Sequence, residues 1–314
     1  MNSFVKRILV ALPTTYILMY YSELAFWAKY NPAEMSPLGL VVTYFFYFLI
    51  TYTFLSVVTM FRVRTVWALF LAGAVYGWLI EGVVVQTMYE YFPIQISWTG
   101  LAWHSLISVF IGWYYVLNVL LQNNYTDTIR VSLFVGLFYG VWSISWWVED
   151  GTITPLPEFS LYVVVTSLIL IGSYYMYNKL KPDPFQLTKI EGYTLAGFFI
   201  VYFVLITIPV QPAALVVLPP LLGVVYIALR KNKTTEQRED IIAVLQGRIV
   251  PLNFVFLLII PVTAIIFYVC ALSLNLSTPT NIFVYMITTL LGIVMFIMSI
   301  VRIFRRKKVE IDRE

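Results

Sequence analysis

Long apolar runs constrain this chain more than any other feature of its sequence. Each run is close to the ~20 residues that a helix needs to cross a ~30 Å hydrocarbon layer, and each is bounded by charged residues, proline or asparagine. The runs cover residues 7–28, 38–61, 65–88, 97–121, 129–148, 159–178, 193–210, 213–229, 249–272 and 282–303. Because they fill most of the 314 residues, we expect an all-α, multi-pass integral membrane protein with about ten transmembrane helices.

The composition fits the same class. Apolar residues make up 61% of the chain and charged residues 11%, against about 25% charged in a typical soluble domain. This balance excludes soluble, disordered and nucleic-acid-binding proteins. Cys270 is the only cysteine, so no internal disulfide or multi-cysteine metal site can form. The chain also has no histidine cluster, phosphate-binding glycine loop or usual nucleophile motif, so we expect no metal and no cofactor.

Basic residues concentrate in every second segment between the apolar runs, which indicates how the chain is oriented in the membrane. If the N-terminus lies in the cytoplasm, every lysine and arginine except Lys29 falls in a cytoplasmic loop or tail. Lysine and arginine concentrate on the cytoplasmic side of membrane proteins. We therefore expect both termini to be cytoplasmic, in a protein of the cell membrane. The opposite segments are acidic or neutral and contain Glu90, Glu149 and Asp150.

Similar motifs in spans three and five suggest an internal repeat. Residues 73–78 (GAVYGW) resemble residues 136–142 (GLFYGVW), and this offset carries each helix onto one of the same orientation. We interpret spans one to six, residues 1–185, as parallel helical-hairpin repeats. Residues 186–314 are expected to form a second bundle with a basic cytoplasmic loop and tail, in which Pro219-Pro220 breaks a helix. Shared composition is the alternative explanation for the similarity.

Ionisable side chains inside the runs are the first candidates for function, because they are costly in a membrane. Glu81 shares a helix face with Gly73 and Gly77, where another helix can pack closely. His104, the only histidine, reaches a similar depth in the next span. We expect the Glu81 carboxylate to meet His104 directly or through one water and to form a catalytic acid–base pair. The alternative is a structural pair that locks the hairpin.

Further candidates come from a polar stripe and a tryptophan cluster. The stripe continues along span four below His104, and a stripe of small residues in span five, with Gly136 and Gly140, matches it. The expected substrate-binding residues are Trp78, Trp103, Ser108, Tyr115, Asn118, Trp142, Glu149 and Asp150. Helix packing and anchoring at the membrane interface are the alternative roles for these residues.

Three functions are compatible with this pattern. The first is a transporter or permease whose site among spans three to five opens outward. The second is an intramembrane enzyme that acts on a lipid or isoprenoid, with Glu81 and His104 as acid and base. The third is a non-catalytic membrane subunit or scaffold. The expected partners are membrane lipids and a small-molecule or isoprenoid ligand, with no nucleic acid. Conservative changes at Asn253 or Thr263, in the last four spans, should be nearly silent.

Overall fold

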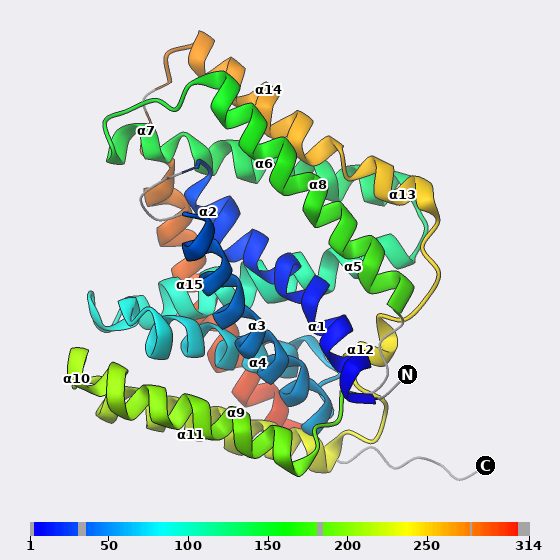
Figure 1. The fold of residues 1–314 in the computed structure, drawn as a ribbon, viewed down its shortest axis with the longest axis vertical. Coiled ribbons are helices and arrows are strands. Elements are labelled where there is room, and N and C mark those ends of the chain that lie inside the picture. Colours follow the sequence, from blue (N-terminus) through cyan, green and yellow to red (C-terminus); the bar gives the residue numbers. More distant parts are fainter. Residues whose placement is uncertain (1–2, 31–35, 181–184, 277, 307–314) are drawn as a thin grey trace.

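The structure is a computed structural model that describes residues 3–30, 36–180, 185–276 and 278–306. Within these residues all regular structure is helical and no strand forms. Ten helices are long and apolar enough to cross a membrane, and they pack side by side (Figure 1). The predicted multi-pass, all-α membrane protein is therefore confirmed. The hairpin repeats and the side that each terminus faces stay predictions.

Several spans change helix type along their length, with π-helical segments labelled η. The first six spans contain α1 (Ser3–Met19), η1 (Tyr20–Leu24), α2 (Ala25–Trp27), α3 (Pro37–Met60), α4 (Val66–Leu79), η2 (Ile80–Val84), η4 (Ile96–Tyr115), α5 (Val116–Leu121), α6 (Tyr125–Ser143), α7 (Ser145–Glu149) and α8 (Leu156–Leu180). The last four spans contain α9 (Lys189–Tyr202), η5 (Phe203–Thr207), α10 (Ile208–Val210), α11 (Ala214–Thr235), α13 (Pro251–Phe256), α14 (Ile259–Ser273) and α15 (Thr280–Arg305). The 3₁₀ helix η3 (Thr87–Tyr89) and the short α12 (Ile241–Val244) lie in connections.

Polar side chains explain where several of these helices begin. At each start, a serine, threonine or asparagine oxygen accepts a hydrogen bond from a backbone N–H two or three residues later, which satisfies a free donor of the first turn. These residues are Ser36 before α3, Thr65 before α4, Asn124 before α6 and Thr188 before α9. At α9, the Glu191 side chain also bonds the Thr188 backbone and completes a capping box.

The helices form three layers in Figure 1. Helices α6, α8 and α14 make one outer layer, α9 and α11 make the other, and α1, α3, α4, η4 and α15 lie between them. Helix α4 packs along η4, and α15 contacts both. The span Val66–Val84 is the most buried of the ten. It carries Glu81, so the predicted acid lies on the central helix of the molecule.

The last four spans pack largely against the first six. Helix α14 contacts α6 and α8, α15 contacts α4 and η4, and α11 contacts α4. The division at residue 185 stays a prediction, but contacts between described residues cross it. The small-residue face of α6 was expected to match the polar stripe of span four, but its Gly136 and Gly140 pack on α14. A Cβ at Gly136 would lie 2.5 Å from the Ile260 carbonyl oxygen, and one at Gly140 would lie 2.8 Å from the Phe267 Cβ.

Asn253 is fully buried, so a change there is expected to lower stability even if activity is unaffected. Its Oδ1 accepts a hydrogen bond from Thr128 at 3.2 Å, and its Nδ2 donates to Asn123 at 3.2 Å. These bonds join α13 to α6, through Thr128, and to the connection between α5 and α6, through Asn123. A buried polar group that loses its partner costs ~1–3 kcal/mol. Thr263 is half-buried and lies against Gly136.

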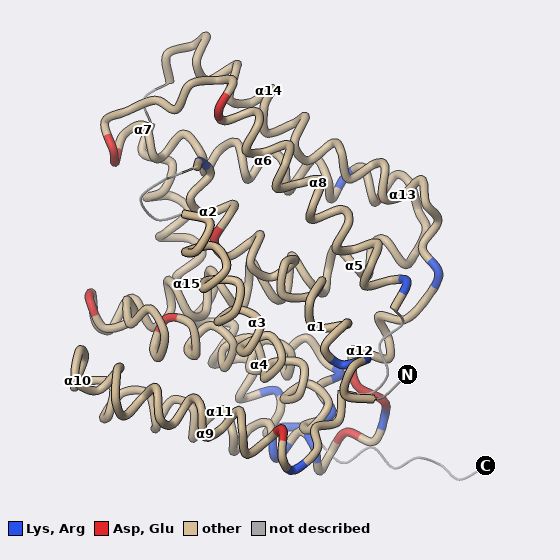
Figure 2. Tube along the Cα trace, in the orientation of Figure 1, with Lys and Arg blue, Asp and Glu red and all other residues tan. Residues whose placement is uncertain are grey.

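Lysine and arginine gather at one end of the molecule, where both described chain ends also lie (Figure 1, Figure 2). Ion pairs connect helices there. Arg7 of α1 donates to both carboxylate oxygens of Glu191 at 2.7 Å, and Tyr52 of α3 donates to the same carboxylate at 2.6 Å. Glu236, which follows α11, pairs with Arg238 and Arg306. The predicted orientation would place this basic end in the cytoplasm.

Candidate functional site

Glu81 and His104 lie in direct contact. Glu81 belongs to η2, the π-helical continuation of α4, and His104 belongs to η4. The Glu81 Oε1 and His104 Nε2 atoms are 2.6 Å apart, and the two side chains are 11% and 2% exposed. Gly77 permits this approach, because a Cβ there would meet the Gly100 carbonyl oxygen and lie 2.9 Å from the His104 Cβ. The predicted contact between the two side chains is confirmed.

A chain of hydrogen bonds fixes the other side of the imidazole ring. Ser108 donates to the Trp103 carbonyl oxygen at 3.1 Å, and Ser22 donates to the Leu18 carbonyl oxygen at 2.8 Å. The Ser22 Oγ also lies 2.9 Å from the Ser108 Oγ and 3.1 Å from His104 Nδ1, so it connects the imidazole to Ser108. These contacts hold the Nδ1 edge of the ring, and the Nε2 edge faces the Glu81 carboxylate.

The second Glu81 oxygen also has a partner. The Thr87 hydroxyl, on η3, donates to Oε2. Both oxygens of Glu81 are therefore held, one by the imidazole and one by a hydroxyl. A carboxylate fixed in this way has a defined direction toward the ring, which is what proton transfer over a short distance requires.

Glu23 is the residue that the sequence reasoning missed. It lies in η1, near the end of the first span, and its carboxylate oxygens accept hydrogen bonds from Tyr47 at 2.7 Å and Trp27 at 3.1 Å. It lines the same pocket as Glu81 and His104. The available signal was an acidic residue inside an apolar run, five residues before the predicted end of that run at residue 28.

The pocket that joins these three groups has a volume of about 250 Å³. Aromatic rings form much of its wall: Phe26, Trp27, Trp98 and Trp103. The indole of Trp103 is fixed, because its Nε1 donates to the Ser22 carbonyl oxygen at 3.0 Å and its ring packs edge-on against Phe26. Polar groups from the connection and the start of the fourth span complete the lining: Thr87, Glu90, Gln95 and Thr99.

Two apolar cavities adjoin the pocket. One, of about 200 Å³, shares Trp103 with it and is otherwise lined mainly by aromatic and aliphatic side chains of η1, η4 and α6, including Trp142. The other, of about 340 Å³, shares Glu23 and Trp27 and extends between the first span and α3. The polar pocket is therefore flanked by space that suits a hydrocarbon chain.

The structure brings only some of the predicted substrate-binding residues to this region. Trp103 lines the pocket, Ser108 supports Ser22, and Trp142 lines the neighbouring apolar cavity, with its ring centre 4.6 Å from that of Trp103. Trp78 lies elsewhere. It is fully buried, donates to the Ile96 carbonyl oxygen and packs on Phe296.

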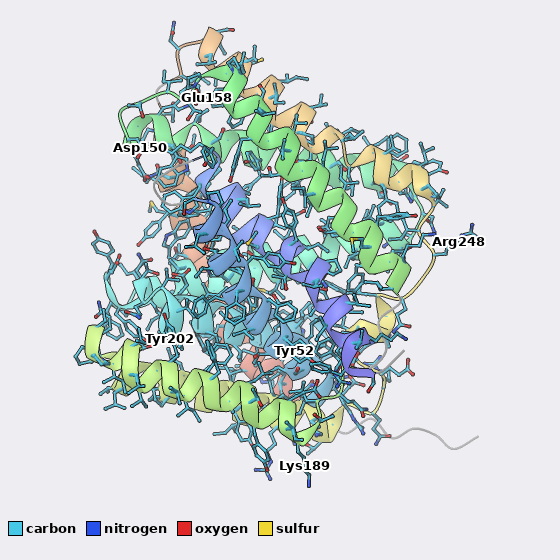
Figure 3. All side chains as sticks on the ribbon, in the orientation of Figure 1. Tyr52, Asp150, Glu158, Lys189, Tyr202 and Arg248 are labelled. Atoms are coloured by element: carbon cyan, nitrogen blue, oxygen red, sulfur yellow. The ribbon has the colours of Figure 1, made fainter. Side chains whose placement is uncertain are left out.

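The remaining candidates lie away from the pocket. Tyr115 is exposed and Asn118 is half-buried, and both lie more than ten residues further along the fourth span than His104. Glu149 contacts Asn281, and Asp150 pairs with Lys29. Figure 3 shows Asp150 at the rim of the molecule. None of these four residues lines the pocket, and their expected role in substrate binding stays a prediction.

The polar stripe of span four does not continue as an open path within the described residues. Next to Ser108, the ring of Tyr21 packs onto Gly112, whose carbonyl oxygen accepts a hydrogen bond from Tyr174 at 2.5 Å. Trp113 is fully buried in the same region. Within the described ranges, no group of three or more histidine, cysteine or acidic residues is placed to hold a metal ion.

Comparisons with protein-family models, with curated proteins and with solved structures found no match to this chain.

Proposed function

We propose that this protein is an intramembrane enzyme that transfers protons to and from an unsaturated lipid or isoprenoid. The observation that carries the proposal is the 2.6 Å contact between Glu81 Oε1 and His104 Nε2, in a pocket that also contains the Glu23 carboxyl group. The two adjoining apolar cavities support a hydrophobic substrate. The pocket would lie in the outer leaflet in the orientation predicted from the positive residues.

The charges in the pocket suit a reaction with a cationic transition state. The Glu81–His104 pair is neutral as a unit while it holds its shared proton, and both oxygens of Glu23 accept hydrogen bonds. In its ionised form, Glu23 places one negative charge beside the aromatic rings of the pocket. A carboxylate and indole faces both stabilise positive charge in a site with little water.

The proposed reaction is a shift of a carbon–carbon double bond. The Glu81–His104 pair gives its proton to one alkene carbon, and the π-electron pair forms the new C–H bond. The resulting carbocation lies between Glu23 and the indole of Trp103. Loss of a proton from a neighbouring carbon to Glu23 forms the new double bond, and proton exchange between Glu23 and the pair restores the site. No oxidant or reductant is consumed, and general acid–base catalysis of this kind contributes typically 10²–10⁴-fold.

A transporter is the second candidate. The polar lining by Glu90, Gln95 and Thr99 on the side away from the basic end favours it, because a hydrophilic ligand could enter there. The packing around Gly112 and Trp113 argues against a polar route through the described part of the bundle in this conformation. We therefore place the enzyme first.

Solvent deuterium tests the proposal with no need for an identified substrate. The purified protein is reconstituted in nanodiscs with the lipid extract of its own membrane and incubated in D₂O. Lipid mass spectra should then show at least one unsaturated species that gains carbon-bound deuterium. A transporter would move its ligand without this mass change.

Three variants and one control complete the experiment. Glu81→Gln, His104→Gln and Glu23→Gln should each abolish the incorporation, whereas Glu239→Gln should not, because Glu239 is an exposed carboxylate near the basic end. Absence of deuterium from every lipid with the wild-type protein would contradict the enzyme and favour the transporter.

A further inference from the structure

A separate cavity opens near the basic end of the molecule. It has a volume of about 740 Å³ and lies between α3, α4, α9 and α11. It shares no residue with the pocket around Glu81 or with its two neighbouring cavities. Figure 2 shows the lysine and arginine residues gathered at this end, and Figure 3 marks the first residue of α9, Lys189, there.

The two parts of this cavity differ in chemistry. Its deeper wall is apolar and includes Val75, Leu79, Leu195 and Phe199. Arg62 and Lys233 line the other part, at the ends of α3 and α11. No carboxylate lines the cavity among the described residues. The cavity is therefore a hydrocarbon-lined space with two positive charges at one end.

The backbone around Arg62 is held in place. Arg62 has a φ of +50°, in the left-handed region that non-glycine residues seldom adopt. Its conformation is supported by Asn232, which is 1% exposed and donates to the Phe61 and Arg62 carbonyl oxygens at 2.9 and 3.1 Å. Thr59 similarly accepts the Phe185 N–H at 3.1 Å, which closes the wall between α3 and the segment before α9.

Two carboxylates at this end are already paired with arginines. Glu191 is bound by Arg7, and Glu236 is bound by Arg238 and Arg306. Asp240 accepts hydrogen bonds from two backbone N–H groups of α12. Among the described residues, the Arg62 guanidinium donates to a backbone oxygen, that of Glu236, at 3.4 Å. Within the described part of the chain, neither Arg62 nor Lys233 has a carboxylate partner, so the positive charge at this end of the cavity is not neutralised.

The depth of the apolar part matches one leaflet. Phe199 lies ten residues into α9 and Leu79 lies thirteen residues beyond the start of α4, which places them about 15 and 20 Å along their helices. Half of a ~30 Å hydrocarbon layer is about 15 Å. An acyl chain that follows this wall would therefore reach the bilayer midplane while its headgroup stayed beside Arg62.

We propose that this cavity binds one acidic phospholipid from the leaflet on the basic side of the protein. Its phosphate would contact Arg62 and Lys233, and one acyl chain would occupy the space between α3, α4 and α9. Anionic lipids are enriched in the cytoplasmic leaflet, and basic pockets between transmembrane helices are suited to their headgroups. This site is independent of the proposed enzymatic reaction.

Native mass spectrometry with two defined lipids tests the site. The protein in mild detergent is titrated with dioleoyl phosphatidylglycerol and, separately, with dioleoyl phosphatidylcholine. The wild type should retain one phosphatidylglycerol with about tenfold or greater preference, since each basic residue near an anionic headgroup adds roughly a fivefold gain. Equal retention of the two lipids would overturn the proposal.

Charge-matched variants locate the binding. The double variant Arg62→Gln/Lys233→Gln should lose the preference for phosphatidylglycerol. The double variant Arg230→Gln/Lys231→Gln removes the same amount of charge from the end of α11 and should keep the preference. Equal loss in both double variants would show that only the net charge matters and would contradict a specific site. Inorganic phosphate that displaces the lipid at millimolar concentration would show an anion site without a chain.

A variant that keeps both charges tests the acyl-chain part. Ala196→Trp fills the cavity from α9, and Gly197→Trp places the same side chain at the next position, where a Cβ would have open space. Only Ala196→Trp should reduce phosphatidylglycerol retention at an unchanged melting temperature. Unreduced retention in Ala196→Trp would overturn the placement of the chain.

Discussion

The roles of single residues in the pocket follow from which hydrogen bonds fix each of them. Glu81 and His104 were identified from the sequence, because two ionisable groups at similar depth in consecutive antiparallel spans are expected to meet. Glu23 was not identified, because it lies close to the expected end of the first run. At that position it resembles a residue at the membrane interface. Ser22 was also missed. A serine in a membrane span usually bonds its own helix backbone, and nothing in the sequence indicates that its oxygen also faces His104.

Ser22 provides a test of positioning at the scale of one residue. Ser22→Ala removes the hydrogen-bond partner of His104 Nδ1 while leaving Glu81, His104 and Glu23 in place. We expect a decrease of about fivefold in deuterium incorporation, because a hydrogen bond of this kind contributes ~1 kcal/mol. The pH profile of the reaction should also change, since the ring loses its hydrogen-bond partner at Nδ1.

The control for Ser22 is Ser273→Ala. Ser273 lies at the end of α14, is exposed and bonds only the Val269 carbonyl oxygen of its own helix. A rate that falls with no change in the pH profile would assign Ser22 a purely structural role.

The positions of the helices in the sequence were largely predictable, but which helices pack against each other was not. Run length and flanking charge located all ten spans, and the predicted run 38–61 differs by one residue at each end from α3, Pro37–Met60. The π-helical segments could not be predicted, because they depend on packing between helices. The partner of α6 was also not predictable. A glycine-containing face shows that some helix packs closely, and several apolar helices offer a compatible surface.

The close contact between α4 and η4 predicts a large effect at Gly77. Gly77→Ala places a methyl group against the Gly100 carbonyl oxygen and the His104 Cβ. The helices must move apart, so we expect a loss of about 1–3 kcal/mol or more of stability, as for other overpacked sites. Thermal unfolding in detergent measures the effect.

Gly172 supplies the matched substitution. It lies in α8, where a Cβ would meet nothing within 4 Å, so Gly172→Ala should be neutral or stabilising by up to about 1 kcal/mol. If Gly77→Ala melts no lower than Gly172→Ala, then α4 and η4 are not as closely packed as described.

The contact between α13 and the α5–α6 connection predicts a second effect, at Asn253. Asn253→Leu keeps the size of the side chain and removes both of its polar atoms, which leaves the Thr128 hydroxyl without one of its acceptors. We expect stability to fall by ~1–3 kcal/mol. Activity per folded molecule should be unchanged, because the site lies on other helices. An unchanged melting temperature would show that these hydrogen bonds contribute little.

At the scale of the whole molecule, charge is divided between the two ends. The basic end is held by paired carboxylates, and the pocket with Glu23, Glu81 and His104 lies away from it. This polarity was predictable from the distribution of lysine and arginine. The ion pairs at the basic end were not predictable from the sequence. Arg7 and Glu191, for example, are separated by most of the chain and meet only through the packing of α1, α3 and α9.

The basic end predicts how stability depends on acid. Burial would raise the pKa of Glu236, but hydrogen bonds from Arg238 and Arg306 outweigh it and lower that pKa from 4.5 to about 2. The stabilisation by the Glu236 carboxylate is therefore present above pH 4.5 and is lost as the pH falls toward 2. Melting temperatures between pH 6 and pH 3 should fall more steeply for the wild type than for Glu236→Gln. Parallel curves would show that Glu236 does not contribute.

The central claim is that the Glu81–His104 pair transfers a proton and is more than a structural connection between two helices. Deuterium incorporation measured beside the melting temperature of the same Glu81→Gln preparation tests it most directly. We predict that incorporation falls by about 100-fold or more, while the protein still folds and melts cooperatively. Incorporation that continues at the wild-type rate in folded Glu81→Gln would contradict the account.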